Sequence, residues 1–350
     1  MRQKDYFEAY IDGYDKVVVY MSKQSYEGKS ARFYLKDSKE QIIELKICSI
    51  EDTQNNYRKY ILEIEEELTI GEEYYVYHEH ARKTIAEYSY IVKTDRFDEE
   101  FFYDGNDLGP MYSRRHTSFA LWAPTAYRIV LELKRNNGLC ETFEMKRGEK
   151  GVWRTTVPGD LNGVAYTYHV RVNGRWRETI DPYAICGGAN SSVSAICDRE
   201  SLRFRTYPLP PMHSACDAVI YETSVRDFTI QSGIGVHHPG TFRGFVEENP
   251  VTQAMQTGFS YLRSLGITHV QLMPVFDFGS VDEVYPQMFY NWGYDPVHHR
   301  CLEGIYSTDI LSYSARMREF GHLVEECHKN GIRVNLDVVF NHAYDKENFA

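Results

Sequence analysis

The sequence has 350 residues, of which 43% are hydrophobic and 25% are charged, and its formal net charge is −11. This length accommodates two or three domains, and the composition is that of a globular protein. The negative charge argues against nucleic acids and anionic membranes as partners, because lysine and arginine supply most of the affinity for both. The N-terminal segment MRQKDYFEAYIDG lacks the apolar core of a secretory signal, and no stretch reaches the roughly 18 apolar residues of a membrane span.

The cysteine and tyrosine contents indicate the cellular compartment and the class of ligand. Seven cysteines without a CxxC pair predict neither a disulfide framework nor a zinc site. Reduced thiols are typical of the cytosol, so we expect a cytoplasmic protein. The 28 tyrosines favour both β-structure and contact with carbohydrate, because tyrosine offers an aromatic face and a hydroxyl group.

Residues 1–104 predict a first all-β module. Short β-branched or aromatic segments alternate with polar turns there, and no long helical period appears. We expect this module to be an immunoglobulin-like sandwich. The turn-rich segment Asp104–Pro110 marks its boundary. The expected strands are Lys16–Met21, Ala31–Lys36, Ile42–Ile47, Tyr60–Ile64 and Glu72–His78.

Residues 105–206 predict a second all-β module, which we also expect to be an immunoglobulin-like sandwich. We place Trp122 and Trp153 in its core, where the tryptophans of such sandwiches commonly lie. Trp176 lies close to the turn Asn173-Gly174, and we leave open whether it contacts glucan. The expected strands are Thr117–Pro124, Arg128–Leu133, Gly151–Val157 and Tyr166–Asn173.

Residues 207–216 form an expected linker, stiffened by the sequence YPLPP. From residue 217 to residue 350, strands and helices alternate, which predicts the first part of a (β/α)8 barrel. The final strand carries branched apolar residues along most of its length, so we expect it to be buried on both faces. The expected strands are Ala218–Tyr221, His269–Pro274 and Ile332–His342, and the expected helices are Thr252–Leu265 and Ser314–Asn330.

Two segments of this third region combine polar and aromatic side chains. The loop YNWGYDP begins at Tyr290 and offers flat apolar faces beside hydrogen-bonding groups, a mixture that suits a polyhydroxylated ring such as a sugar. Asp337, Asn341 and His342 lie toward the end of the final strand, where a parallel β/α barrel presents its site. We therefore expect a carbohydrate ligand.

These segments resemble a known family. YNWGYDP, followed by EGIYST and DVVFNH, is similar to the type I pullulanases of the α-amylase superfamily, glycoside hydrolase family 13. FALWAPTA, GVW and DPYA resemble the carbohydrate-binding module 48 of such enzymes, and FEAYIDG resembles the extra N-terminal β module of some bacillar pullulanases. The resemblance implies retaining hydrolysis of α-1,6 branch linkages in pullulan, starch or glycogen.

The resemblance also implies roles for single residues. Tyr294 would stack on the glucose that precedes the cleaved bond, and His342 would donate a hydrogen bond to a hydroxyl of the same glucose. Asp295 would bind a sugar hydroxyl or hold a neighbouring arginine. Asn291 and Trp292 are the remaining expected contacts of the glucan.

Two further residues would act at a distance from the sugar. Asp337 would position an arginine of the fourth barrel strand. Asn341 marks a calcium ligand in some amylases, but pullulanases do not depend on that site, so we expect no metal and no cofactor, with calcium as the alternative. The family pattern has tyrosine where this chain has His299 and Phe340, and the histidine could change the shape of the sugar pocket.

The catalytic carboxyl groups of that family lie on the fourth, fifth and seventh barrel strands, whereas the sequence ends at Ala350, just beyond the third. We therefore expect no catalytic residue in this chain, which would be the N-terminal portion of a longer enzyme and inactive alone. We read Glu222, Arg226, Asp227 and Asp277 as structural. A non-catalytic glucan-binding protein and an enzyme of the isoamylase or branching type remain as alternatives.

Overall fold

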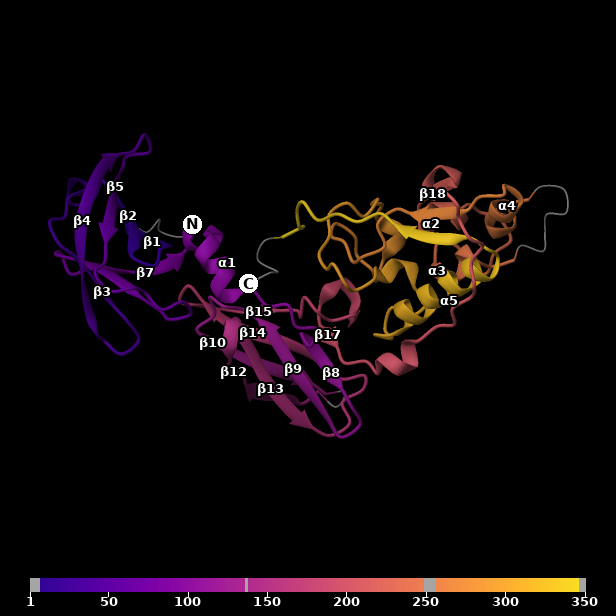
Figure 1. Cartoon of the computed structure of the whole chain (residues 1–350), viewed down its shortest axis with the longest axis horizontal. Helices are drawn as coiled ribbons and strands as arrows, with labels where there is room; N and C mark the ends of the chain where they lie inside the picture. The colour runs from indigo at the N-terminus through magenta and orange to yellow at the C-terminus, as the bar shows by residue number, and fades with distance from the viewer. Residues whose placement is uncertain (1–6, 136–137, 249–255, 346–350) are drawn as a thin grey trace.

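The structure, a computed structural model, describes residues 7–135, 138–248 and 256–345. Figure 1 shows three bodies that follow one another along the chain: a β-barrel, a pair of β-sheets, and a small parallel sheet flanked by helices. Each body has its own cluster of buried apolar side chains. Among the described residues, no helix has the length and apolar character needed to cross a membrane.

The first body is a closed barrel, so the prediction of a sandwich for this module was wrong. Strand β1 pairs antiparallel with β2 and parallel with β7, which closes the sheet on itself. A register shift in β4 between Ile47 and Ser49 adds the local twist that a curved sheet requires. The order around the barrel is β1 (Phe7–Gly13), β2 (Lys16–Ser22), β5 (Tyr57–Glu63), β4 (Ile42–Asp52), β3 (Phe33–Lys36), β6 (Tyr75–His78) and β7 (Lys83–Tyr88).

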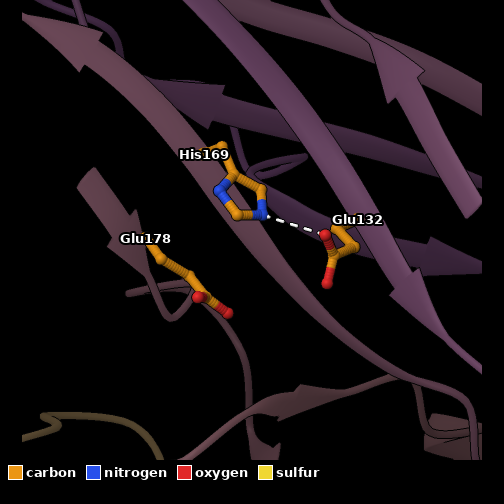
Figure 2. Close-up of side chains that lie close together, drawn as sticks. All are labelled: Glu132, His169 and Glu178. Carbon is orange, nitrogen blue, oxygen red and sulfur yellow. Dashed lines mark hydrogen bonds and ion pairs between the residues drawn. The ribbon is translucent and has the colours of Figure 1, made fainter. Parts of the chain in front are cut away.

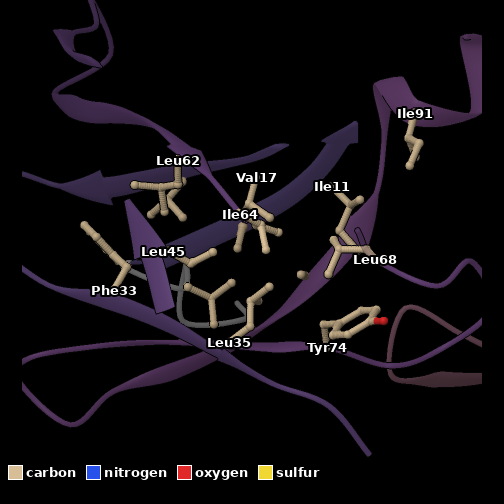
Figure 3. Close-up of a cluster of buried hydrophobic side chains, with 14 of the residues drawn as sticks. Ile11, Val17, Phe33, Leu35, Leu45, Leu62, Ile64, Leu68, Tyr74 and Ile91 are labelled. Atoms are coloured by element: carbon tan, nitrogen blue, oxygen red, sulfur yellow. The ribbon is translucent and has the colours of Figure 1, made fainter. Parts of the chain in front are cut away.

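The interior of the barrel is filled by one side of each strand. Figure 3 shows Ile11, Val17, Leu35 and Leu62 pointing into a common cluster, and none of these four side chains has exposed surface. Each buried aliphatic side chain of this size contributes about 1.5–3 kcal/mol to folding. The same alternation of apolar and polar residues serves a sandwich and a barrel, because both bury one face of each strand.

Helix α1 (Asp95–Phe101) lies at the joint between the first two bodies. The Trp122 indole donates a hydrogen bond to the carbonyl of Phe101 over 2.9 Å, and the tryptophan is 37% exposed. Our placement of Trp122 in the core was therefore wrong. In β9 (His116–Trp122), Phe119 and Leu121 face the core, so a residue next to Leu121 faces outward.

The second body consists of two antiparallel sheets that share one apolar core. Trp153 is buried in this core, as predicted, and its indole donates to the carbonyl of Ala123. One sheet has the order β12 (Lys146–Arg147), β13 (Val152–Pro158), β9 and β8 (Gly109–Tyr112). The other has the order β11 (Cys140–Glu144), β10 (Arg128–Lys134), β14 (Ala165–Val172), β17 (Ser194–Ala195) and β16 (Cys186–Gly187), and β15 (Arg175–Thr179) also pairs with β14.

The third body is built on three parallel strands in the order β18 (Ile220–Thr223), β19 (His269–Leu272) and β20 (Arg333–Leu336). The prediction of a long final strand buried on both faces was wrong, because β20 ends at Leu336 and its residues are only partly buried. Val338 and Phe340 are 39% and 75% exposed. In the described sheet β20 pairs on one side only, with β19, so its apolar residues are incompletely covered.

The helices of this body are α2 (Val225–Thr229), α3 (Phe242–Phe245), α4 (Gly258–Ser264) and α5 (Ala315–Lys329). Helix α5 matches its prediction within one residue at each end, and Gly331 follows it with a positive φ of 80°. The predicted helix from Thr252 is shorter in the structure, and its first residues, 252–255, lie outside the described residues. The expected linker contains no strand and only a short turn at residues 215–217.

Candidate functional site

The candidate site lies at the carboxyl ends of the three parallel strands. Each strand leads directly into a segment that carries polar groups: Ser224 follows β18, the long loop to Ser314 follows β19, and Asp337 follows β20. Parallel strands bring their carboxyl ends to one edge of the sheet, so residues that are far apart in sequence meet there.

Three exposed aromatic side chains stand at this edge, and we call them the aromatic face: Tyr290, Trp292 and Tyr294. They are 56%, 57% and 38% exposed. Large aromatic side chains are usually much more buried, and an exposed set that is held in place by hydrogen bonds is typical of a binding surface.

A chain of hydrogen bonds orients the first half of the aromatic face. The Trp292 indole donates to the Tyr290 hydroxyl over 2.6 Å, and that hydroxyl donates to Asp227 Oδ2 over 2.5 Å. The bond to Asp227 raises the pKa of Tyr290, and Arg226 lies 5.2 Å from the tyrosine ring centroid. We had read Asp227 and Arg226 as structural; the structure places both against Tyr290.

Tyr294 is held from two sides. Its hydroxyl donates to Asp337 Oδ2 over 2.7 Å, and its carbonyl oxygen accepts a hydrogen bond from Nε2 of His342 over 2.7 Å. Burial and the bond to Asp337 raise the pKa of Tyr294 to about 12, so the phenol stays protonated at neutral pH. The structure thus brings together Tyr294, Asp337 and His342, because Tyr294 forms a hydrogen bond with each of the other two.

Asn291 and Asp295 brace the loop beneath the aromatic face. The Asn291 amide donates to the Gly279 carbonyl and to Asp295, and its oxygen accepts from the backbone N–H of Gly293. Gly293 has a φ of +90°, and a Cβ atom there would lie 2.9 Å from the ring of Phe278. The sugar contacts that we expect of Asn291 and Asp295 stay predictions, and their side chains also hold the loop.

The residues that depart from the family pattern pack on each other. The ring of His299 stacks on Phe340 with centroids 5.7 Å apart, and its Nε2 lies 3.0 Å from the Val339 carbonyl oxygen. Asn341 is exposed, and its Oδ1 lies 3.1 Å from Nδ1 of His342. The expectation that Asn341 contributes to no metal site stays a prediction.

A second group of charged residues is entirely buried, and we call it the acidic cluster: Asp277, Glu283, Glu303 and Arg316. Oxygens of the three carboxyl groups lie within 4.8 Å of one another. Arg316 pairs with Glu283 over 3.0 Å and with Asp277 over 3.6 Å. Burial, reinforced by Glu283, raises the pKa of Asp277 to about 7, and burial also raises that of Glu303.

The acidic cluster joins the second body to the third. Ser191 donates to Asp277 over 2.7 Å, and the backbone N–H of Glu283 donates to Asn190 over 2.7 Å. Of these residues we singled out only Asp277 from the sequence. The others are far apart along the chain, and although Glu303 begins the segment EGIYST, that motif does not reveal which residues Glu303 meets.

A hollow of 660 Å³ lies beside the acidic cluster and contains none of the predicted sugar-contacting residues. The second body contributes Thr167, Glu178 and Asn190 to its wall, and the third contributes Phe289 and Tyr344. The aromatic face is therefore an open surface and not a wall of this hollow. Trp176, on the second body, is 45% exposed and has the Arg128 guanidinium 5.8 Å from its ring.

Three family models match successive parts of the chain. Residues 7–93 match the pullulanase N1-terminal domain, residues 107–184 match carbohydrate-binding module 48 (isoamylase N-terminal domain), and residues 252–350 match the α-amylase catalytic domain. The order of the three models is the order of the three bodies in the fold.

Relatives match over nearly the whole chain. A pullulanase of Bacillus subtilis (strain 168) is 36% identical over 98% of this chain and 47% of its own length. The crystal structure of a pullulanase from Anoxybacillus sp. LM18-11 complexed with maltotriose is 37% identical, covers 97% of this chain and 49% of that chain, and has a TM-score of 0.87. The type I pullulanase of Bacillus subtilis complexed with maltose has a TM-score of 0.88 at 34% identity, over 99% of this chain and 48% of that one. The chain spans about half the length of these relatives.

Proposed function

The chain belongs to the type I pullulanases of the α-amylase family, and from this membership we propose that it supplies the glucan-binding side of an enzyme that hydrolyses α-1,6 branch linkages in pullulan, starch or glycogen. Family membership, the maltotriose and maltose complexes of the relatives, and the aromatic face support this proposal.

The observation that carries the proposal is the clamped, exposed ring of Tyr294. Asp337 and His342 fix its hydroxyl and its backbone, so the ring face is held ready before a sugar arrives. A preoriented ring under a glucose unit favours the flattened, positively charged sugar of the transition state. His342 and Asp295 are proposed to contact sugar hydroxyls beside this ring, and Asn291 and Trp292 complete the proposed contact surface.

The chemistry that we propose is retaining hydrolysis. It requires one carboxylate as nucleophile and one carboxylic acid as proton donor, about 5 Å apart. We propose that neither comes from residues 1–350, because none of the carboxyl groups named above corresponds to the family's nucleophile or acid. Asp227 and Asp337 instead accept hydrogen bonds from tyrosines, and the carboxyl groups of the acidic cluster are at most 2% exposed. The chain by itself should not cleave pullulan, and no cofactor is required.

Four finer points belong to the same proposal. We propose that the second body is an immunoglobulin-like module in which Trp176 meets glucan, and that the third body is the first part of a (β/α)8 barrel. The proposed domains are residues 1–104, 105–206 and 217–350, with 207–216 as linker. All seven cysteines are free thiols, which supports a cytoplasmic location.

Binding tests the glucan-recognition part of the proposal. The purified chain is titrated with maltotriose and run on native gels that contain amylopectin, alongside Tyr294→Ala and a matched control, Tyr261→Ala. Tyr261 on α4 has the same exposure as Tyr294, 38%. Losing a stacking ring should weaken glucan affinity by about 2- to 10-fold in Tyr294→Ala only. Equal affinity of both variants and the parent chain would contradict the proposal.

Hydrolysis tests the enzymatic part. Reducing sugar is measured from pullulan with the chain alone and with a fusion that adds the remaining half of the Bacillus subtilis pullulanase. We expect no release by the chain and release by the fusion, reduced by Tyr294→Ala and His342→Ala but not by Tyr261→Ala. Cleavage by the chain alone would mean that its own carboxyl groups are catalytic. A folded fusion that binds glucan without cleaving it would favour a non-catalytic glucan-binding protein.

A further inference from the structure

Three side chains of metal-binding type meet on one sheet of the second body, and one of them, Glu178, also lines the hollow beside the acidic cluster. Figure 2 shows Glu132, His169 and Glu178 on neighbouring strands β10, β14 and β15. His169 lies directly opposite Glu178 in the β14–β15 register. On the other side, His169 pairs with Val130, and Glu132 is two residues further along β10. Because side chains two residues apart share a face, the register itself directs all three groups to one side of the sheet.

The distances suit a single ion. Nε2 of His169 lies 3.1 Å from Oε2 of Glu132, and one ligand atom from each of the three residues lies within 4.8 Å of the other two. Ligands about 2.1 Å from a shared ion in tetrahedral geometry lie roughly 3–4 Å apart, so small side-chain rotations suffice. The strands fix the backbone on which these rotations occur.

The two carboxylates already hold a positive charge between them. Nζ of Lys134 lies 2.6 Å from Oε1 of Glu178 and 3.9 Å from Oε1 of Glu132. The Thr167 hydroxyl donates to the same oxygen of Glu178 over 3.0 Å and steadies the carboxylate from behind.

We propose that Glu132, His169 and Glu178 bind one divalent late first-row transition-metal ion, such as Zn²⁺ or Ni²⁺, which displaces Lys134 from between the carboxylates. One imidazole with two carboxylates is a ligand set that these ions accept, whereas Ca²⁺ prefers six to eight oxygens. The ion bridges three strands, and water fills its remaining positions, since the side chain of Glu178 is 49% exposed.

The acidic cluster is the weaker candidate, although its three carboxyl groups also lie within 4.8 Å of one another. The guanidinium of Arg316 already lies among them and is fully buried, so a divalent ion would have to share the space with a fixed positive charge. Lys134 is different, because its side chain is 31% exposed and can swing into solvent.

The test is a competition titration of the whole chain with Zn²⁺ and Ni²⁺ against a chromophoric chelator, after the exposed thiols have been alkylated. His169→Ala and Glu178→Gln should each weaken the tightest site by about 10-fold or more. Lys134→Gln should tighten it, because the competing ammonium is gone. The matched control is His116→Ala, which removes an exposed histidine from the other sheet and should leave the affinity unchanged.

Two results would overturn the proposal. If His169→Ala and His116→Ala weaken binding equally, the chain binds metal only adventitiously through surface histidines. If Lys134→Gln leaves the affinity unchanged or weakens it, the ion does not lie between the carboxylates. Circular dichroism of each variant without metal separates a lost ligand from a lost fold, and Cys140→Ser, across the β10–β11 pair from Lys134, reports whether a thiol contributes.

Discussion

The third body contains two sets of carboxyl groups in opposite surroundings. The first set, Asp227 and Asp337, lies near the surface and accepts hydrogen bonds from the tyrosine hydroxyls of the aromatic face. The carboxyl groups of the acidic cluster are at most 2% exposed, and two of them, Asp277 and Glu283, pair with the same buried arginine. In this body, carboxyl groups near the surface position aromatic rings for ligand binding, whereas buried carboxyl groups stabilise the fold.

Removal of the buried cation should have the largest effect. Arg316→Met leaves the carboxyl groups of the acidic cluster without their positive partner, and breaking a buried ion pair costs about 3–5 kcal/mol. We expect a lower urea midpoint and faster hydrogen exchange in α5. Arg318→Met, at an exposed position two residues further along α5, is the matched control and should change neither quantity. A stable Arg316→Met variant would show that the carboxyl groups are held neutral without the arginine.

The next largest effect concerns pH. The pKa of Asp277 rises from 3.8 to about 7 on burial, so the folded protein holds this proton more tightly than the unfolded chain does. Folding therefore takes up a proton between these two values, and the free energy of unfolding falls as the pH rises through that window. Asp277→Asn should flatten this slope in urea titrations at several pH values. An unchanged slope would show that other groups cause the pH dependence of the free energy of unfolding. Asp282→Asn, at a half-exposed position nearby in the sequence, is the control.

A smaller effect is expected where the aromatic face is supported from below. Gly293→Ala places a Cβ at a φ of +90° and 2.9 Å from Phe278, a strain that costs about 1–3 kcal/mol locally. Because the loop carries Trp292 and Tyr294, we expect weaker glucan binding with little change in α5 hydrogen exchange. Gly138→Ala is the control, since it also has a positive φ but an added Cβ meets nothing within 4 Å. Weakening by both variants would argue against a local effect.

The smallest effect should come from one hydroxyl of the aromatic face. Tyr294→Phe keeps the ring but loses the bond to Asp337, which is worth about 0.5–1.5 kcal/mol. Maltotriose affinity should fall by less than about 10-fold. The urea midpoint for unfolding of the third body, which contains the acidic cluster, should not change. If Tyr294→Phe and Tyr294→Ala bound glucan equally weakly, the ring orientation and not the ring itself would be the main contribution.

Local sequence patterns predicted many of the helices and strands, but they did not predict which distant segments pair with each other. The 3.6-residue period located α5 within one residue, and the tendency of sandwich tryptophans to be buried correctly placed Trp153 in the core. Strand alternation, followed one residue beyond Leu121, would have placed Trp122 outside. Closure of the first barrel depends on β1 meeting β7, and alternation along single strands does not report which strands meet.

The candidate site divides in the same way. Motifs indicated Tyr294, Asp337 and His342 together, and the structure joins them by two hydrogen bonds. They did not indicate that Asp227 reaches Tyr290, nor that Glu283 pairs with Arg316, because those contacts join segments that are far apart in the sequence. Residue types at strand ends were predictable, whereas partners across strands required the fold.

The closed barrel of the first body also has a consequence for how the chain folds. Its closing contact joins the first strand to the last, so the ring cannot form until the whole module has been synthesised, and folding is slow for such non-local pairing. During that interval β1 and β7 present open edges, which are the sites where chains pair with each other. Once closed, the barrel has no edge left to offer. We therefore expect the need for chaperones to be concentrated in the synthesis of this module and to end when β7 joins β1.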